Sequence, residues 1–116
     1  MNLMTEYPHC QDIIYLGFDP STGKEINKRR PAVVISVTPY NKLVGLCVVC
    51  PITHTKHEFG SVKVHDTKID GYVNAWQIYS FDYRKRHMQK VTTMSAADFN
   101  LVIQNYTQIL ENGMSL

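Results

Sequence analysis

Five polar side chains with catalytic potential stand at the ends of, or inside, segments that the sequence predicts to be buried strands. Glu25 and Arg30 bound a polar stretch before an apolar run, and Thr53 and His54 directly follow another apolar run. Gln77 lies inside a third apolar segment. The end of a buried strand fixes a side chain well, so these residues can form a preorganised site. Together they offer proton acceptors, hydrogen-bond donors and positive charge.

Each of these residues also has a purely structural interpretation. Arg30 could cap a loop, Thr53 could satisfy a turn, and Glu25 could be the solvated ion-pair partner of Lys24 or Lys28. The residue types and their positions therefore leave a functional and a structural interpretation open.

Cys47 and Cys50 have the C-x-x-C spacing of redox and zinc pairs. Side chains three residues apart in a strand point to opposite faces, so these thiols are poorly placed to share a metal or a disulfide. Cys50, His54 and His57 do not complete a zinc set, because the chain lacks a second cysteine pair. We interpret the cysteines as small buried hydrophobes and expect no metal and no cofactor.

Short strands would position these groups, and the sequence predicts five or six of them. They fall at residues 13–18, 31–37, 44–52, 59–65 and 72–81, with a further short one at 88–92. Residues 19–30 have no periodicity and are predicted to be a long polar loop. A turn at Tyr40-Asn41-Lys42 is expected to join the second and third strands. So many strands in so short a chain predict a small barrel.

The hydrophobic period changes near the C-terminus and predicts a helix over about 96–111. Ser95 is the expected N-cap, with Asp98 three residues later, and Asn112-Gly113 is the expected stop. Its apolar residues share one helical face, which we expect to pack on the barrel as core. They are Phe99, Val102, Ile103, Tyr106, Ile109 and Leu110.

Size and charge bound the remaining possibilities. A chain of 116 residues is expected to form a single domain spanning 1–116. Its formal net charge is only +2, but eight of its 12 basic residues fall in two clusters, within 24–30 and 84–90. No apolar run approaches the ~20 residues of a membrane helix. The start lacks a signal-peptide pattern, and three cysteines is an odd number, so we expect a cytoplasmic protein away from the membrane.

Several short motifs follow one another in a specific order and spacing. They are the segment 12–20, Gly23-Lys24-Glu25, the run R-P-A-V-V-I-S at 30–36, Tyr40-Asn41, V-C-P-I-T at 49–53, Asp70-Gly71, Gln77, and Arg84-Lys85-Arg86. This ordered set, which covers residue 11 to about residue 110, resembles the MazF/PemK toxins of type II toxin–antitoxin systems.

The resemblance implies a mainly-β fold, a small SH3-like barrel of the CcdB/PemK kind with a C-terminal helix, usually a symmetric homodimer. It also implies a metal-independent endoribonuclease (an mRNA interferase) that cuts single-stranded RNA at short sequences and inhibits translation and growth. The implied partner is a MazE/PemI-like antitoxin whose acidic flexible segment covers the RNA site. Contact with DNA is expected only indirectly, through the antitoxin complex.

The resemblance also assigns expected roles to residues. Arg30 and Thr53 match the family's catalytic arginine and threonine, which stabilise the reacting phosphate, and Glu25 is a candidate base or a clamp that orients Arg30. A second group is expected to bind RNA. It consists of Lys24, Arg29, Gln77, Arg84 and Arg86.

Two positions depart from the family pattern. Many members carry an acid where this chain has Trp76, which we expect to be core or dimer interface in preference to a stacking platform for a base. His54 stands where relatives often have Ser or Thr, and we hypothesise that it takes over proton transfer from the missing acid; a surface histidine is the equal alternative. If Trp76 instead marks a lost activity, the chain would be a non-catalytic nucleic-acid- or protein-binding barrel.

Overall fold

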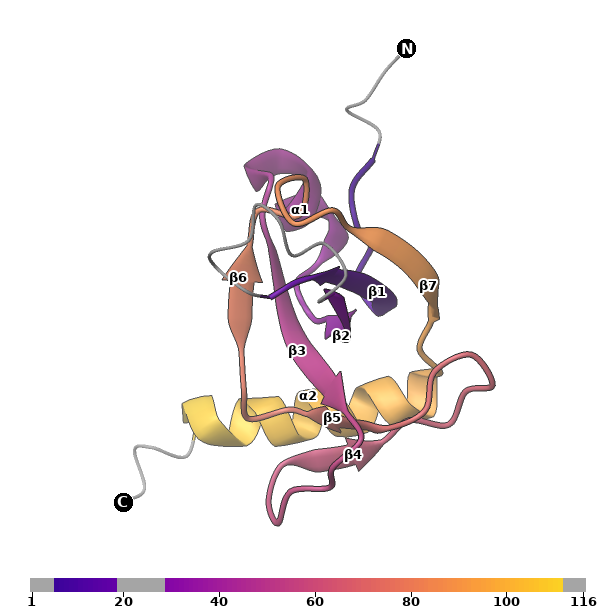
Figure 1. Cartoon of the computed structure of the whole chain (residues 1–116). Coiled ribbons are helices and arrows are strands. Elements are labelled where there is room, and N and C mark those ends of the chain that lie inside the picture. Colours follow the sequence, from indigo (N-terminus) through magenta and orange to yellow (C-terminus); the bar gives the residue numbers. More distant parts are fainter. Residues whose placement is uncertain (1–5, 19–28, 112–116) are drawn as a thin grey trace.

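The structure is a computed structural model that describes residues 6–18 and 29–111. It is built mainly from β-strands, with one short and one long helix (Figure 1). In chain order the elements are β1 (Asp12–Gly17), β2 (Arg29–Val34), α1 (Thr38–Val44), β3 (Cys47–Thr53), β4 (Ser61–Lys63), β5 (Tyr72–Asn74), β6 (Tyr79–Phe81), β7 (Gln89–Thr93) and α2 (Ala96–Glu111). No helix in these described ranges is long and apolar enough to span a bilayer.

All the strand pairs are antiparallel, and β3 is the strand on which the sheet is organised. The strands follow the order β4-β5-β3-β2-β1-β7, and β6 pairs with β3 outside this path. The first half of β3 pairs with β6, through Cys47–Phe81 and Val49–Tyr79, whereas its last residues pair with β5, through Thr53–Tyr72. Within the described residues no ladder joins β4 to β7, so the sheet forms a barrel-like but open layer.

Two hydrophobic clusters occupy opposite faces of the central strands. One contains Ile13, Val33 and Cys50 and includes Val102 of α2. The other contains Ile14, Ala32 and Val49. Neighbouring residues of each strand fall in different clusters, as the alternation of side chains along a strand requires. The predicted mainly-β fold with a C-terminal helix is confirmed.

The helix α2 lies along the sheet, and only its first two-thirds is core (Figure 1). Val102 is fully buried and Phe99 packs on the first cluster, as predicted. Ile109 and Leu110 are exposed, which corrects the prediction that the whole apolar stripe is buried. The yellow end of α2 in Figure 1 reaches past β5, and its residues Ile109 and Leu110 face solvent. The expected stop at Asn112-Gly113 lies outside the described residues.

A helix replaces the turn that was predicted between the second and third strands. α1 has a proline in its first turn, and Gly45 ends it with a left-handed φ of 82°. The buried Asn41 side chain donates hydrogen bonds to the carbonyl oxygens of Pro8 and Ser36. The tertiary bond to Pro8 and the local bond to Ser36 stabilise a seven-residue helix that is too short for sequence periodicity to reveal.

The predicted strand 72–81 is also wrong, because it is two short strands separated by a turn at Ala75 and Trp76. Gln77 is therefore in a connection between β5 and β6 and not inside a strand. The predicted strand 59–65 narrows to β4, and most of the predicted loop 19–30 lies outside the described residues.

Candidate functional site

The pairing of β2 with β3 brings Arg30 and Thr53 together. Ala32 lies opposite Pro51 in this antiparallel ladder, and continuing two residues along each strand places Arg30 opposite Thr53 on the same face. A pocket of about 240 Å³ opens here. It is lined by Arg30, Pro31, Ile52, Thr53, His54 and Asp70. Three of the four residues expected to be catalytic thus line one pocket.

The Thr53 hydroxyl is held in a short turn. Its Oγ1 donates a hydrogen bond to the carbonyl oxygen of Thr55 at 3.0 Å, where β3 ends and the chain bends. A lone pair of Oγ1 remains available, and rotation about the C–O bond can redirect the proton to a ligand. His54 and the Arg30 side chain are exposed, so both can meet a ligand that enters from solvent.

Gly71 packs closely against the backbone carbonyl of Thr53. Its φ is +143°, and a Cβ on Gly71 would lie 2.5 Å from the carbonyl oxygen of Thr53. Only glycine permits both this backbone conformation and this approach. In the Asp70-Gly71 pair, which the sequence marked as a turn, Asp70 lines the pocket and Gly71 packs against the backbone of Thr53.

Asp70 is the charged pocket residue that the site prediction missed, beside the apolar Pro31 and Ile52. Its carboxylate lies 3.2 Å from the ammonium of Lys63, and both side chains are substantially exposed. Lys63 also lies over the ring of Tyr72, with its Nζ 5.3 Å from the centroid. Because Tyr72 pairs with Thr53, this charged and aromatic group borders the pocket. The Asp-Gly motif was the one feature of the sequence that drew attention to Asp70.

Arg29 points away from this pocket, on the opposite face of β2. Gly17 is its cross-strand partner, whereas Leu16 is the partner of Arg30. One Nη of Arg29 donates a hydrogen bond to the Oε1 of Gln89 at 2.9 Å, and its buried Nε has no partner in the described parts of the chain. Lys24 and Glu25, which were expected to bind RNA and to act in catalysis, lie outside the described residues.

Gln77 lies on an aromatic cluster. Its Nε2 donates a hydrogen bond to the hydroxyl of Tyr79 at 2.7 Å. The ring of Tyr79 stacks on Phe81 and meets Phe18 edge to face, with centroids 5.5 and 5.0 Å apart. Tyr79 is opposite Val49 on β3, so it shares the face that carries Arg30 and Thr53.

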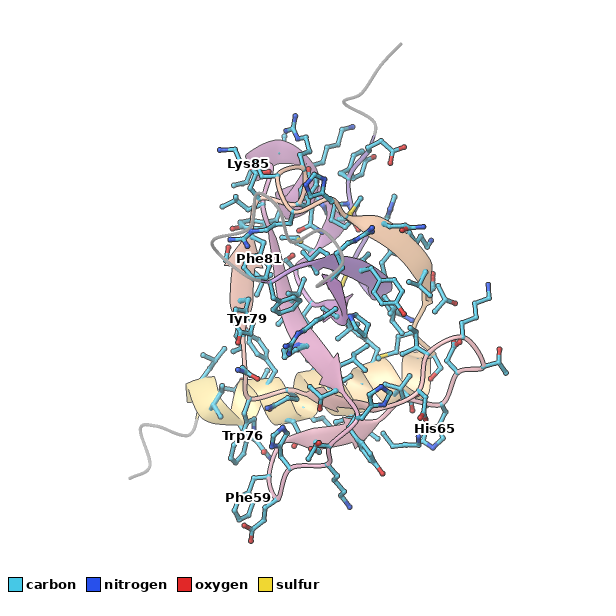
Figure 2. All side chains as sticks on the ribbon, in the orientation of Figure 1. Phe59, His65, Trp76, Tyr79, Phe81 and Lys85 are labelled. Atoms are coloured by element: carbon cyan, nitrogen blue, oxygen red, sulfur yellow. The ribbon has the colours of Figure 1, made fainter. Side chains whose placement is uncertain are left out.

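Arg84 and Arg86 lie in the turn after β6, apart from the pocket. The guanidinium of Arg86 covers the Phe81 ring at 4.5 Å, and its Nη1 donates to the carbonyl oxygen of Gly17. Arg84 is exposed and lies 5.9 Å from the Tyr83 ring centroid. Figure 2 shows Lys85, Phe81, Tyr79 and Trp76 in succession along one side of the molecule.

The cysteines pack as hydrophobic residues. Cys47 and Cys50 belong to different clusters, which confirms that they face opposite sides of β3. Burial raises the pKa of each thiol to about 12, and in Cys47 the charge of Asp82 adds to this effect. Both therefore stay protonated at neutral pH, and neither is a nucleophile or a metal ligand in that form.

The comparisons with known proteins agree over nearly the whole chain. Residues 9–110 match the family described as the PemK-like, MazF-like toxin of type II toxin–antitoxin systems. The endoribonuclease toxin MazF of Escherichia coli K12 is 32% identical over 96 residues, which are 82% of this chain and 86% of that protein. The endoribonuclease toxin ChpB of the same strain is 33% identical over 87 residues, 69% of this chain and 74% of that protein.

A solved structure shares the fold. In the crystal structure of MazE–MazF (form II) from Deinococcus radiodurans, the matching chain superposes with a TM-score of 0.80 at 26% identity. The match covers 91% of this chain and 97% of that one. On the match over residues 9–110 and the identity to MazF, this chain belongs to the PemK-like, MazF-like family of type II toxin–antitoxin toxins.

Proposed function

We propose that this protein is a toxin that cuts single-stranded RNA at short specific sequences in the cytoplasm and thereby inhibits translation and growth. The observation that carries the proposal is the pocket in which Arg30, Thr53 and His54 converge. Membership of a family with endoribonuclease relatives supports the same conclusion. The nucleophile is the 2′-hydroxyl of the RNA itself, which attacks the adjacent phosphorus, so the reaction requires no metal.

Arg30 and Thr53 stabilise the phosphate as negative charge accumulates on its oxygens. A guanidinium gives forked hydrogen bonds to two phosphate oxygens and stays charged at all working pH values. The Thr53 hydroxyl breaks its hydrogen bond to the carbonyl oxygen of Thr55 and donates to the same phosphate instead. Donors aimed at developing charge are worth most in a preorganised site, and the loss of one typically lowers the rate by about 10²–10³.

Proton transfer needs a base for the 2′-hydroxyl and a donor for the leaving 5′-oxygen. Histidine exchanges a proton readily near neutral pH, and His54 lines the pocket next to Thr53. Glu25 remains the alternative base or the clamp for Arg30. Arg30 itself is a poor acid, because a guanidinium gives up its proton only at very high pH.

The working unit in this proposal is a homodimer, because one small barrel offers little room for an RNA groove. Lys24, Arg29, Gln77, Arg84 and Arg86 contribute to RNA binding in this arrangement. The solved relative is a MazE–MazF complex, and by analogy a MazE/PemI-like antitoxin neutralises this chain by laying an acidic segment over the RNA site. DNA is met only through that antitoxin.

Incubating purified protein with a defined RNA in the presence of a chelator tests the proposal. We expect cuts at fixed sites that leave 5′-hydroxyl ends, since the 5′-oxygen is the leaving group. The Arg30→Ala protein should lose the cuts, whereas Lys42→Ala, which removes a positive charge on the remote α1, should keep them. Intact RNA, or cutting that stops in chelator, would contradict the proposal.

Trp76 supports one competing function. An indole cannot accept a proton at the position where relatives often hold an acid, so the chain could be a non-catalytic barrel that binds nucleic acid or protein. The same experiment separates the two, because such a barrel would bind RNA and leave it uncut.

A further inference from the structure

Two large aromatic side chains stand exposed at the end of the molecule that carries β4 and β5. Phe59 is 61% exposed and Trp76 is 41% exposed. Of the two expectations for Trp76, core or dimer interface, this exposure contradicts the first. Their rings are nearly parallel, with an interplanar angle of 12° and centroids 5.9 Å apart. Figure 2 shows the two side chains next to each other, at the lower end of the edge that carries Tyr79.

The indole of Trp76 is held in place before any ligand arrives. Its Nε1 donates a hydrogen bond to the carbonyl oxygen of Asn105 in α2 at 2.9 Å. It also rests directly on Gly60, because a Cβ there would lie 2.7 Å from the ring. Gly60 also has a left-handed φ of +78°. Both the backbone conformation and the close contact with the indole therefore require glycine at this position. A rigid aromatic surface that stays exposed loses little conformational entropy when a ligand stacks on it.

The aromatic pair and the Arg30 pocket are connected by two short paths. The loop 54–60 begins at the pocket residue His54 and ends at the pair, and it carries the exposed residues Lys56, His57 and Glu58 between them. Along the other path, Tyr72 pairs with Thr53, and Trp76 follows four residues later. Four residues of extended chain span at most about 13 Å. A strand of RNA held at the pocket can therefore reach the pair.

We propose that Phe59 and Trp76 form a stacking platform for a base of the RNA strand that flanks the phosphate held in the Arg30 pocket. This inference rests on the proposed function and adds to it the place where a neighbouring nucleotide binds. Every nucleobase has an apolar face, so stacking on aromatic rings is tolerant of sequence. Lys56 of the adjacent loop offers a positive charge to the RNA backbone on the path from the pocket, and Glu58 offsets it next to Phe59. The helix behind the pair has no Lys or Arg, so the two rings supply the contact with the base.

Trp76 is the only tryptophan in the chain, so its fluorescence reports on this platform directly. The probe is a nine-nucleotide 2′-O-methyl oligoadenylate, which lacks the nucleophile and cannot be cut. We expect the oligonucleotide to quench the fluorescence in a saturable manner, and inorganic polyphosphate of equal charge to leave it unchanged. No quenching by the oligonucleotide, or equal quenching by polyphosphate, would overturn the inference.

Substitution of Phe59 tests the stacking energy without disturbing the seat of Trp76. Phe59→Leu keeps an apolar side chain but removes the ring, and we expect it to weaken oligonucleotide binding by roughly 5- to 150-fold. Phe59→Tyr should restore most of the affinity, and Leu43→Ala, an exposed apolar change on α1, should leave it unaltered. Unchanged affinity in Phe59→Leu overturns the inference.

Two further measurements separate this platform from other possibilities. If Phe59→Leu changes the elution volume in size-exclusion chromatography, the pair is an interface between protein chains and the inference is wrong. The outcome is also independent of catalysis, because the probe is uncleavable. Quenching with no cleavage of ordinary RNA would support the platform and contradict the proposed enzyme. Cleavage of ordinary RNA with no quenching would support the enzyme and contradict the platform.

Discussion

The two faces of β1, β2 and β3 are built from neighbouring residues of the same strands, yet they carry different kinds of side chain and only one of them is covered by a helix. One face, with Ile13, Val33 and Cys50, is aliphatic and is covered by α2. The other, with Ala32 and Val49, continues into the aromatic residues Tyr79 and Phe81 and, at the ends of β2 and β3, into Arg30 and Thr53. The first face holds the fold together, whereas the second combines core with an open rim that is available for chemistry.

The largest expected effect separates the two arginines of β2. Arg30→Ala should lower the cleavage rate at saturating RNA by about 10²–10³ or more, because it removes the guanidinium from the pocket. Arg29→Ala, on the opposite face, should raise KM with a much smaller change in kcat. Equal losses of kcat in the two variants would contradict the division between the faces. Matching thermal denaturation curves would show that both variants fold.

Gly71 offers a test through the backbone. Gly71→Ala should destabilise the protein by about 1–3 kcal/mol and lower the cleavage rate, because the new Cβ would displace the carbonyl of Thr53. Gly17→Ala is the matched control, since its Cβ would meet only an ordinary contact of 3.8 Å with the carbonyl oxygen of Arg86. Urea denaturation and cleavage assays of both variants measure the difference. An unaffected Gly71→Ala protein would show that the close approach of Gly71 to Thr53 does not matter for the pocket.

The helix-covered face should be sensitive to acid. Burial alone would raise the pKa of Asp98, but hydrogen bonds from the backbone and ring of His65, the charge of His65 and a hydrogen bond from Ser95 lower it below its usual value of 3.8. Asp98 therefore stabilises the folded state fully above about pH 4, and this stability is lost as pH falls through the lowered value.

Asp98→Asn tests this pH dependence. The variant should be less stable than the unmodified chain at pH 7, and the difference should shrink as the pH is lowered from 5 to 2. Thermal denaturation across this range is the measurement. Asp66→Asn, which changes a carboxylate on the nearby exposed loop, is the control. A constant difference between Asp98→Asn and the unmodified chain would show that the carboxylate charge does not stabilise α2.

The smallest expected effect lies on the open face, in the salt dependence of RNA binding. Loss of one phosphate contact through Arg84→Ala should reduce the slope of log Kd against log salt by about 0.7. Arg84→Lys keeps the charge and should keep the slope. A titration with the uncleavable oligonucleotide at several salt concentrations measures both. An unchanged slope in Arg84→Ala would place Arg84 outside the RNA path.

The sequence predicted the family and the overall arrangement of strands better than it predicted short elements and individual side-chain environments. The motifs around Arg30 and Thr53 indicated the family and so implied the pairing of the two strands. Periodicity alone could not show that Asn41 fixes a short helix, because its partner Pro8 lies 33 residues away in the sequence. It also missed Asp70, because a turn motif does not reveal which cavity the turn borders. Trp76 was expected to be core or dimer interface, and in the single chain it packs on Gly60 with its ring exposed.

The central position of β3 has a consequence for when the protein can act during its synthesis. β2 supplies Arg30 and β3 supplies Thr53, but β3 is completed only when β5 and β6 pair with its two halves. A slip of one residue in these ladders would turn Thr53 to the opposite face. Asp70 lines the pocket and Tyr72 pairs with Thr53, so a nascent chain that ends before β5 lacks an assembled pocket.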